Sequence, residues 1–320
     1  MREQGTGNRE QVASVLLPPS AFRLSVAASP PRRLAAFVGR LARNRLALVG
    51  AVIVVLFVVM SLFAPWLAPR DPNRQIATDA LQGPSLRYPF GTDNLGRDSL
   101  SRVIFGARVS LFVGLTSMAL AAMIGVPLGL VAGYYGSWFD SLAMRAMDTL
   151  LAFPALLLAI FIVAVLGPSL TNAILAVGII YIPAFARVTR ANVLSLREKE
   201  FVEAERCLGA SDGRVMARTV LPNCLSPLVV QFSLGVGYAM LVEAGLSFLG
   251  LGVQPPTPAW GQMVGLARNF ITLAPWLITF PGVAIFLAVL AFNFLGDGLR
   301  EATDPRLRGQ RLAAGKGGRA

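Results

Sequence analysis

Apolar positions in this chain come mostly in long unbroken runs, without the spacing of a soluble amphipathic helix or strand. Three runs, at 46–66, 109–135 and 149–186, contain no charged residue over 21, 27 and 38 positions. A helix needs about 20 apolar residues to cross a bilayer, so we expect the third run to cross twice, with its break at Gly167-Pro168. Two further apolar runs follow. The expected crossings are 46–66, 109–135, about 149–166, about 169–186, about 224–247 and about 273–296.

Composition agrees with a membrane location. Hydrophobic residues make up 55% of the 320 positions and charged residues only 14%, against about 25% charged in soluble domains. A soluble core does not need this much apolar mass, whereas a bilayer requires an apolar outer surface as well. We therefore predict an all-α polytopic membrane protein of six transmembrane helices, embedded in a lipid bilayer.

The basic residues predict the orientation of these six crossings. With both termini inside, 22 Lys and Arg lie on inner segments and 7 on outer ones, and such a bias marks the cytoplasmic side. The net charge of +12 thus has an explanation that involves no nucleic acid, because no soluble domain concentrates the charge. The expected inner segments are 1–45, 136–148, 187–222 and 297–320, and the main outer segment is the extracytoplasmic loop 67–108.

The regions outside the crossings differ in character. Residues 1–31 are rich in Pro, Ser, Gly and Arg, which is typical of a disordered tail. Residues 32–45 combine apolar residues at helical spacing with several Arg, which predicts a basic amphipathic helix beside the membrane. We expect a core permease domain at 109–296 and a cytoplasmic C-terminal tail at 297–320.

Few residues suit catalysis or metal binding. The chain has no His, and its two cysteines, Cys207 and Cys224, lack metal-ligand spacing. It also has no Gly-rich Walker loop of the form GxxxxGK[ST]. We therefore expect no catalytic, cofactor or metal site, and no binding of ATP by this chain itself.

The segment 187–222, the candidate coupling loop, is the most informative part of the sequence. Residues 203–208 favour a helix, and Gly209 suits the left-handed turn that ends one. Ser211 is a suitable N-cap for a second helix, and Pro222 marks the entry into the next crossing. A short helix held between two membrane helices fits a groove in a cytoplasmic partner.

Two polar groups of residues lie in or beside crossings. Gln231, Glu243 and Ser247 lie in the fifth crossing, where an acid is a candidate for function. Either they line the translocation path or Glu243 makes a fixed hydrogen bond near the outer end. In the outer loop, Arg97, Asp98 and Arg102 are expected to form an ion-pair cluster. Asp93, Arg97 and Asp98 are candidate extracytoplasmic contacts for a partner, with a structural staple of the loop as the alternative.

One further pattern concerns packing. Small residues recur every fourth position in the second crossing, which lets another helix approach closely. We expect static packing along this row, which consists of Ser117, Ala121, Gly125, Gly129 and Gly133.

The candidate coupling loop resembles the EAA loop of ATP-binding-cassette (ABC) importer permeases, which docks on the ATPase subunit. The matching segment is FVEAERCLGASDGRVMARTVLPN at 201–223. Glu205 and Thr219 depart from the usual Ala and Ile. The resemblance assigns the docking role to Glu203, Ala204, Glu205, Gly209, Ser211, Leu221 and Pro222.

Three more segments, 88–111, 245–264 and 294–308, resemble the two outer loops and the C-terminal end of the C-type permease of dipeptide, oligopeptide and nickel importers. The resemblance implies a type I ABC importer fold in the bacterial inner membrane. It also implies a second homologous permease as heterodimer partner, two cytoplasmic ATP-binding subunits that bind ATP-Mg, and an extracytoplasmic solute-binding protein. The expected cargo is a dipeptide or oligopeptide.

Two other classes of protein fit the sequence less well. A self-contained ion-coupled transporter usually shows inverted repeats and several charges within its crossings, whereas here Glu243 is the one acid in an expected crossing. A membrane enzyme would need a convergent cluster of acid, base or metal ligands.

Overall fold

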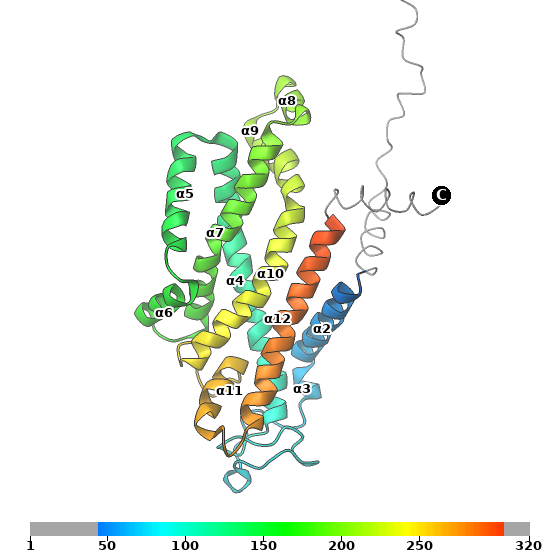
Figure 1. Ribbon diagram of the computed structural model, residues 1–320, viewed down its shortest axis with the longest axis vertical. Helices are drawn as coiled ribbons and strands as arrows, with labels where there is room; N and C mark the ends of the chain where they lie inside the picture. Colours follow the sequence, from blue (N-terminus) through cyan, green and yellow to red (C-terminus); the bar gives the residue numbers. More distant parts are fainter. Residues whose placement is uncertain (1–43, 304–320) are drawn as a thin grey trace, which may run out of the picture. The chain divides into compact units, whose positions relative to one another are not determined.

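The computed structural model describes residues 44–303, which are helical in all their long elements (Figure 1). The expected tail at 1–31, nearly all of the amphipathic helix at 32–45, and residues 304–320 lie outside the described residues. The main helices are α2 (Arg45–Leu62), α3 (Ala64–Leu67), α4 (Ser99–Tyr135), α5 (Ser137–Leu151), α6 (Ala155–Leu166), α7 (Leu170–Arg197), α8 (Glu200–Cys207), α9 (Asp212–Val215), α10 (Leu221–Phe248), α11 (Trp260–Ala267) and α12 (Trp276–Thr303).

Five helical segments are long and apolar enough to cross a membrane: α2, α4, α7, α12, and α10 together with α9. The expected crossing at about 149–166 is not one continuous helix. The chain there forms α5 and α6, which meet at an angle of 89° and count as a sixth span only when taken together. The break falls before Pro154, whose backbone is extended. A proline also pushes the preceding residue away from helical geometry, so the helix ends there.

Several helices extend beyond the charge-free runs. α4 begins at Ser99 instead of 109, because the Asp98 side chain accepts a hydrogen bond from the Ser101 backbone N–H and caps the helix. α12 likewise continues to Thr303, and α7 to Arg197. The outer loop is therefore shorter than expected, since charge-free runs mark the apolar part of a helix and not its capped ends.

Close packing of α4 on α7 forms the centre of the bundle. All five members of the small-residue row are buried in α4. A methyl group on Gly125 would lie 2.6 Å from the Ile182 carbonyl oxygen, and one on Gly133 would lie 2.9 Å from Val193 Cβ. The expected packing face is confirmed, and α7 is its partner.

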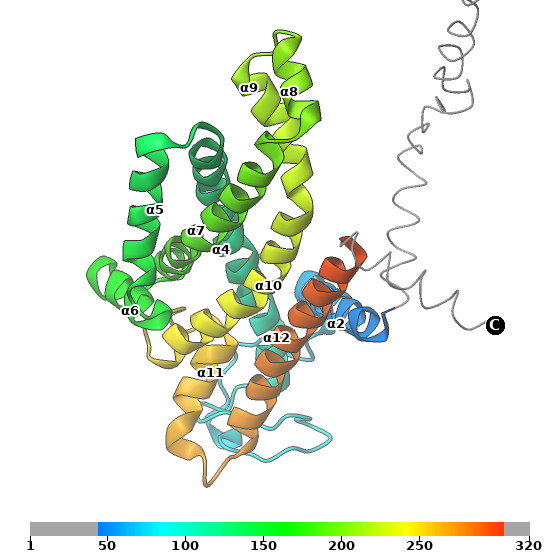
Figure 2. The same ribbon diagram turned by 45° about the horizontal axis from the view of Figure 1, so that its top comes forward.

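The α8 and α9 helices lie at one end of the bundle, while α11 and the loop 68–98 lie at the other (Figures 1 and 2). The start of α2 and the end of α12 lie side by side, because Asn44 Nδ2 donates a 2.7 Å hydrogen bond to Glu301 Oε2. Both point away from the α11 end (Figure 1).

Candidate functional site

The candidate coupling loop folds as a helix, a tight turn and a second helix. α7 extends to Arg197, then α8 begins at Glu200. After α8 the Gly209 N–H donates to the Arg206 carbonyl at 2.9 Å, and the Ala210 N–H to the Glu205 carbonyl at 3.1 Å. This pair of bonds is a Schellman motif, which needs a left-handed residue at the position of Gly209. Gly209 has φ 82°, as the sequence predicted.

The second helix of the loop is continuous with a membrane crossing. α9 passes through a π-helical turn, η4 (Met216–Val220), directly into α10, which starts at Leu221-Pro222. Ser211 stands at the expected N-cap position of α9 but makes no side-chain capping bond. α9, the π-helical turn and α10 therefore form one continuous helical segment.

The inner side of the α8–α9 pair is a small core. Val202 and Val215 are fully buried. Beside them the Thr219 hydroxyl lies 2.7 Å from each carboxylate oxygen of Glu205. Glu205 and Thr219 are the two positions at which the sequence departs from the usual EAA pattern, so the two unusual residues contact each other. The bond joins α8 to the π-helical turn before α10.

A tyrosine that the sequence patterns did not single out joins this loop to α4. Tyr134, near the end of α4, donates from its hydroxyl to Asp212 Oδ1 at 2.7 Å and accepts from Arg206 Nε at 3.2 Å. The Arg206 guanidinium also lies over its ring, 4.9 Å from the centroid. The hydrogen bond to Tyr134 raises the pKa of Arg206 above its ordinary value. A lone Tyr at a helix end carries no signal of such a contact.

The outer side of the α8–α9 pair is open to solvent and partly apolar. Glu203 and Ala204 are exposed on α8. Leu208, at the tip, is 87% exposed, and Phe201 is 46% exposed. An exposed Leu on a rigid turn, beside an acid, suits insertion into a groove of another protein.

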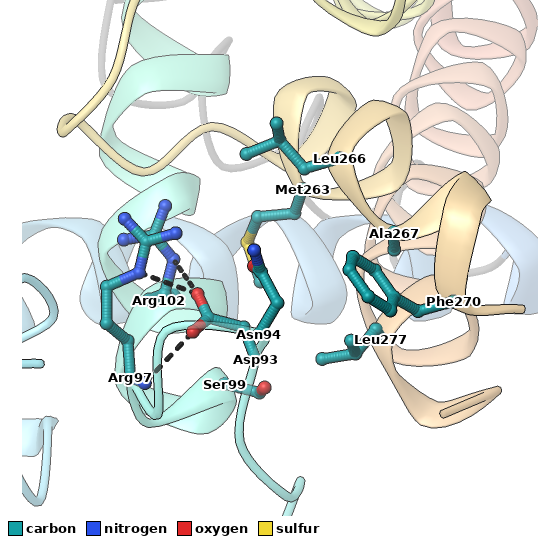
Figure 3. Close-up of a pocket in the computed structure, with 10 residues that line it drawn as sticks. All are labelled: Asp93, Asn94, Arg97, Ser99, Arg102, Met263, Leu266, Ala267, Phe270 and Leu277. Carbon is teal, nitrogen blue, oxygen red and sulfur yellow. Dashed lines mark hydrogen bonds and ion pairs between the residues drawn. The ribbon is translucent and has the colours of Figure 1, made fainter. Parts of the chain in front are cut away.

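At the other end of the bundle, the charged residues of the outer loop form a buried cluster (Figure 3). Asp93 accepts from Arg97 Nε at 2.6 Å and lies 3.8 Å from Arg102 Nε. Asp98 instead caps α4. The acid that pairs with the arginines is therefore Asp93, and the expected pairing with Asp98 is wrong. Arg97 and Asp98 are almost fully buried. A cavity of about 20 Å³ beside Asp93, Arg97 and Arg102 has room for about one water molecule.

A tight turn projects from the outer loop. The Ser85 N–H donates to the Tyr88 carbonyl at 2.8 Å, and Leu86 between them is fully exposed. Tyr88 is buried below the turn, where its hydroxyl donates to Asp79. This hydrogen bond, with the Arg87 charge nearby, lowers the pKa of Asp79 below its ordinary value. The turn is therefore a rigid support for an exposed apolar side chain.

Of the candidate path residues of the fifth crossing, Glu243 and Ser247 come together and Gln231 lies apart from them. Glu243 is 0% exposed and accepts a 2.6 Å hydrogen bond from the Ser247 hydroxyl. The Val253 N–H in turn donates to Ser247 at 3.2 Å, which ties the chain after α10 to the helix. Gln231 is half-buried about three turns away. The burial of Glu243 supports the fixed hydrogen-bond alternative in this conformation, and its role in a path stays a prediction.

Metal ligands do not cluster in the part of the chain that the structure describes: residues 44–303 contain no group of three or more His, Cys, Asp or Glu side chains placed to hold an ion.

Comparison with known families decides between the classes of transporter. A model described as "Binding-protein-dependent transport system inner membrane component" matches residues 125–309. A second, the "N-terminal TM domain of oligopeptide transport permease C", matches residues 33–84. The chain belongs to the family of binding-protein-dependent inner membrane permeases.

Two curated relatives of this permease are similar over most of their length. The dipeptide transport system permease protein DppC of Alkalihalophilus pseudofirmus is 48% identical over 269 residues, or 84% of this chain and 88% of the relative. The glutathione transport system permease protein GsiD of Escherichia coli O1:K1 / APEC is 49% identical over 274 residues, or 85% of this chain and 90% of the relative.

The permease shares its fold with a solved transporter. An inward-facing structure of the MetNI methionine ABC transporter matches 64% of this chain and 98% of that chain, with a TM-score of 0.52 and 18% identity. The likeness confirms the type I ABC importer fold. The chain is thus a multi-pass inner membrane permease subunit without a catalytic role, which works with an ATPase and a binding protein. The self-contained transporter and the membrane enzyme are excluded.

Proposed function

We propose that this permease is one of two unlike membrane subunits of an importer for dipeptides or similarly short peptides. The two relatives at 48% and 49% identity carry dipeptide and glutathione in their names, and both compounds are short peptides with free carboxylates. Under this proposal the binding protein selects the cargo and delivers it to the permeases.

The observation that carries the coupling role is the α8–α9 pair itself. It exposes Leu208 and Glu203 to solvent on a turn that is fixed internally by Glu205 and Thr219. Its second helix continues into α10 without a break. ATP binding and hydrolysis on the partner subunits move this pair, and the bundle then switches between inward-open and outward-open packings. Glu203, Ala204 and Leu208 form the docking face.

A second permease subunit completes the translocation path. α10 packs on α4, α7 and α12 yet exposes large apolar residues in the single chain. In the single chain, other helices cover only one side of α10. A translocation path between two subunits accounts for the uncovered side, and the second subunit is the homologous permease. The exposed residues on α10 are Leu225, Val229, Tyr238, Leu241 and Phe248.

Both termini are placed in the cytoplasm under this proposal. The excess of basic residues on the α8–α9 side supports it, as does the contact of Asn44 with Glu301, which brings the described ends to one side. The outer loop then faces the binding protein. Its exposed tip at Leu86 is the proposed contact, while half-buried Asp93 and buried Arg97 and Asp98 hold the loop in shape.

The coupling role is tested in the reconstituted complex of both permeases, the ATPases and the binding protein. Gly209→Val forces a β-branched residue to φ > 0, at a cost of about 1–3 kcal/mol. Glu203→Lys reverses a charge on the docking face. Both variants should insert normally and lose ATPase stimulation by the binding protein.

The matched control is Gly213→Val. Gly213, like Gly209, has open space around it, but its φ is not positive, so this variant should keep stimulation. Wild-type stimulation and uptake in both Gly209→Val and Glu203→Lys would refute the coupling role of the loop.

A further inference from the structure

We propose that Tyr134 is a positioning residue that fastens the α8–α9 pair to α4, so that motion of the pair reaches α4 directly and not only through α7 and α10. The inference rests on the proposed coupling role of α8–α9. It adds a tertiary contact to the two connections that the chain itself makes.

The two chain connections lead to α7 and α10 and not to α4. At one end α7 joins α8 through Glu198 and Lys199, where Glu198 has left helical geometry. At the other end α9 continues through the π-helical turn into α10. The internal bond of Glu205 to Thr219 ties α8 to this turn and likewise makes no contact with α4.

Tyr134 supplies the contact with α4. Within residues 44–303, the hydrogen bonds that join α4 to α8 and α9 both pass through its hydroxyl. The donor bond goes to Asp212 on α9 and the acceptor bond comes from Arg206 on α8, so one oxygen holds both helices. Each bond involves a charged partner, which strengthens it. The ring is buried, so the hydroxyl has little freedom to move.

The end of α4 is itself held firmly. Arg197, at the end of α7, donates to the Gly133 carbonyl oxygen at 3.0 Å. Below this point Gly125 and Gly133 pack against the backbone of α7. A force applied at Tyr134 therefore reaches α4 and α7 as one packed unit. Arg206 and Asp212 are themselves exposed.

The first test is Tyr134→Phe in the full reconstituted complex, with uptake and ATP hydrolysis measured in the same vesicles. Phe keeps the ring under Arg206 and removes both hydroxyl bonds. The number of substrates taken up per ATP should fall by at least about fivefold, the factor that corresponds to the net free energy of a single hydrogen bond, because two such bonds are lost. Stimulated ATP hydrolysis should stay close to the wild-type rate, since the docking face is intact.

The matched control is Tyr135→Phe. Tyr135 is the next residue, is 54% exposed, and its hydroxyl has no hydrogen-bond partner in the described part of the chain. This variant should transport like the wild type. On the partner side, Asp212→Asn keeps an acceptor for Tyr134 and should retain coupling, whereas Asp212→Leu should reproduce the loss.

A spin label on Cys207, which is exposed on α8, reports the motion directly when Cys224 is replaced. Without ATPase subunits the label should be more mobile in Tyr134→Phe than in Tyr135→Phe. Unchanged uptake per ATP in Tyr134→Phe would overturn the proposal, as would an equal loss in Tyr135→Phe. Failure of the coupling role itself would appear separately, as normal stimulation in Gly209→Val and Glu203→Lys.

Discussion

The packing of α4 on α7 can be tested by adding a single methyl group to it. In Gly129→Ala the new Cβ would lie 2.8 Å from Thr189 Cβ, and closer still to the Ala186 carbonyl oxygen. An ordinary contact needs about 3.5–4.0 Å, so the two helices must separate locally by about 1 Å. Such overpacking costs about 1–3 kcal/mol.

Gly282→Ala in α12 provides the reference for this substitution. Gly282 also lies inside a crossing helix, but its new Cβ would meet nothing within 4 Å. Both variants gain the same helix propensity, about 1 kcal/mol for Gly to Ala. This gain cancels in the comparison, so the difference between the two variants isolates the overpacking at the α4–α7 contact.

The assay uses the thiol of Cys224, which is fully buried, in a Cys207→Ser background. A thiol-reactive dye follows its exposure as the purified complex is heated. We expect the midpoint of Gly129→Ala to lie about 5 °C below that of Gly282→Ala, from about 2–4 °C per kcal/mol. Equal midpoints would show that α4 and α7 are not in close contact at this position.

Two further predictions concern the crossing and the outer loop. Glu243→Gln should keep assembly and uptake, because Gln still accepts a hydrogen bond from Ser247. Glu243→Leu leaves the Ser247 hydroxyl without that acceptor, at a cost of about 1–3 kcal/mol, and should reduce the yield of assembled complex. Loss of uptake by Glu243→Gln with normal assembly would instead show that the charge of Glu243 takes part in transport. Leu86→Cys, in a chain without Cys207 and Cys224, should react with an impermeant reagent in spheroplasts with an intact inner membrane, and labelling only after lysis would reverse the orientation. Leu86→Asp should weaken the stimulation of ATP hydrolysis by the binding protein without affecting basal ATP hydrolysis.

The sequence predicts the local features because they depend on neighbouring residues. Gly209 ends α8 since a left-handed turn needs a residue without a side chain, and the small residues of α4 are buried because they recur at helical spacing. The break at Pro154 shows the limit of this reasoning. The charge-free run around it, 149–186, reads as two crossings divided at Gly167-Pro168, yet α5 and α6 meet at 89° beside Pro154.

Apolar runs, basic-residue bias and short motifs by themselves determine that this chain is a helical membrane protein of the importer permease family, because these signals are local or compositional. Only the tertiary structure shows that Asp93 pairs with Arg97 and Arg102, that Glu243 is buried against Ser247, and that Tyr134 joins α4 to α8 and α9. Tyr134 and Asp212 are separated by 78 positions. Such contacts depend on how whole helices pack, and helical spacing specifies which face is buried but not which residue of another helix it meets.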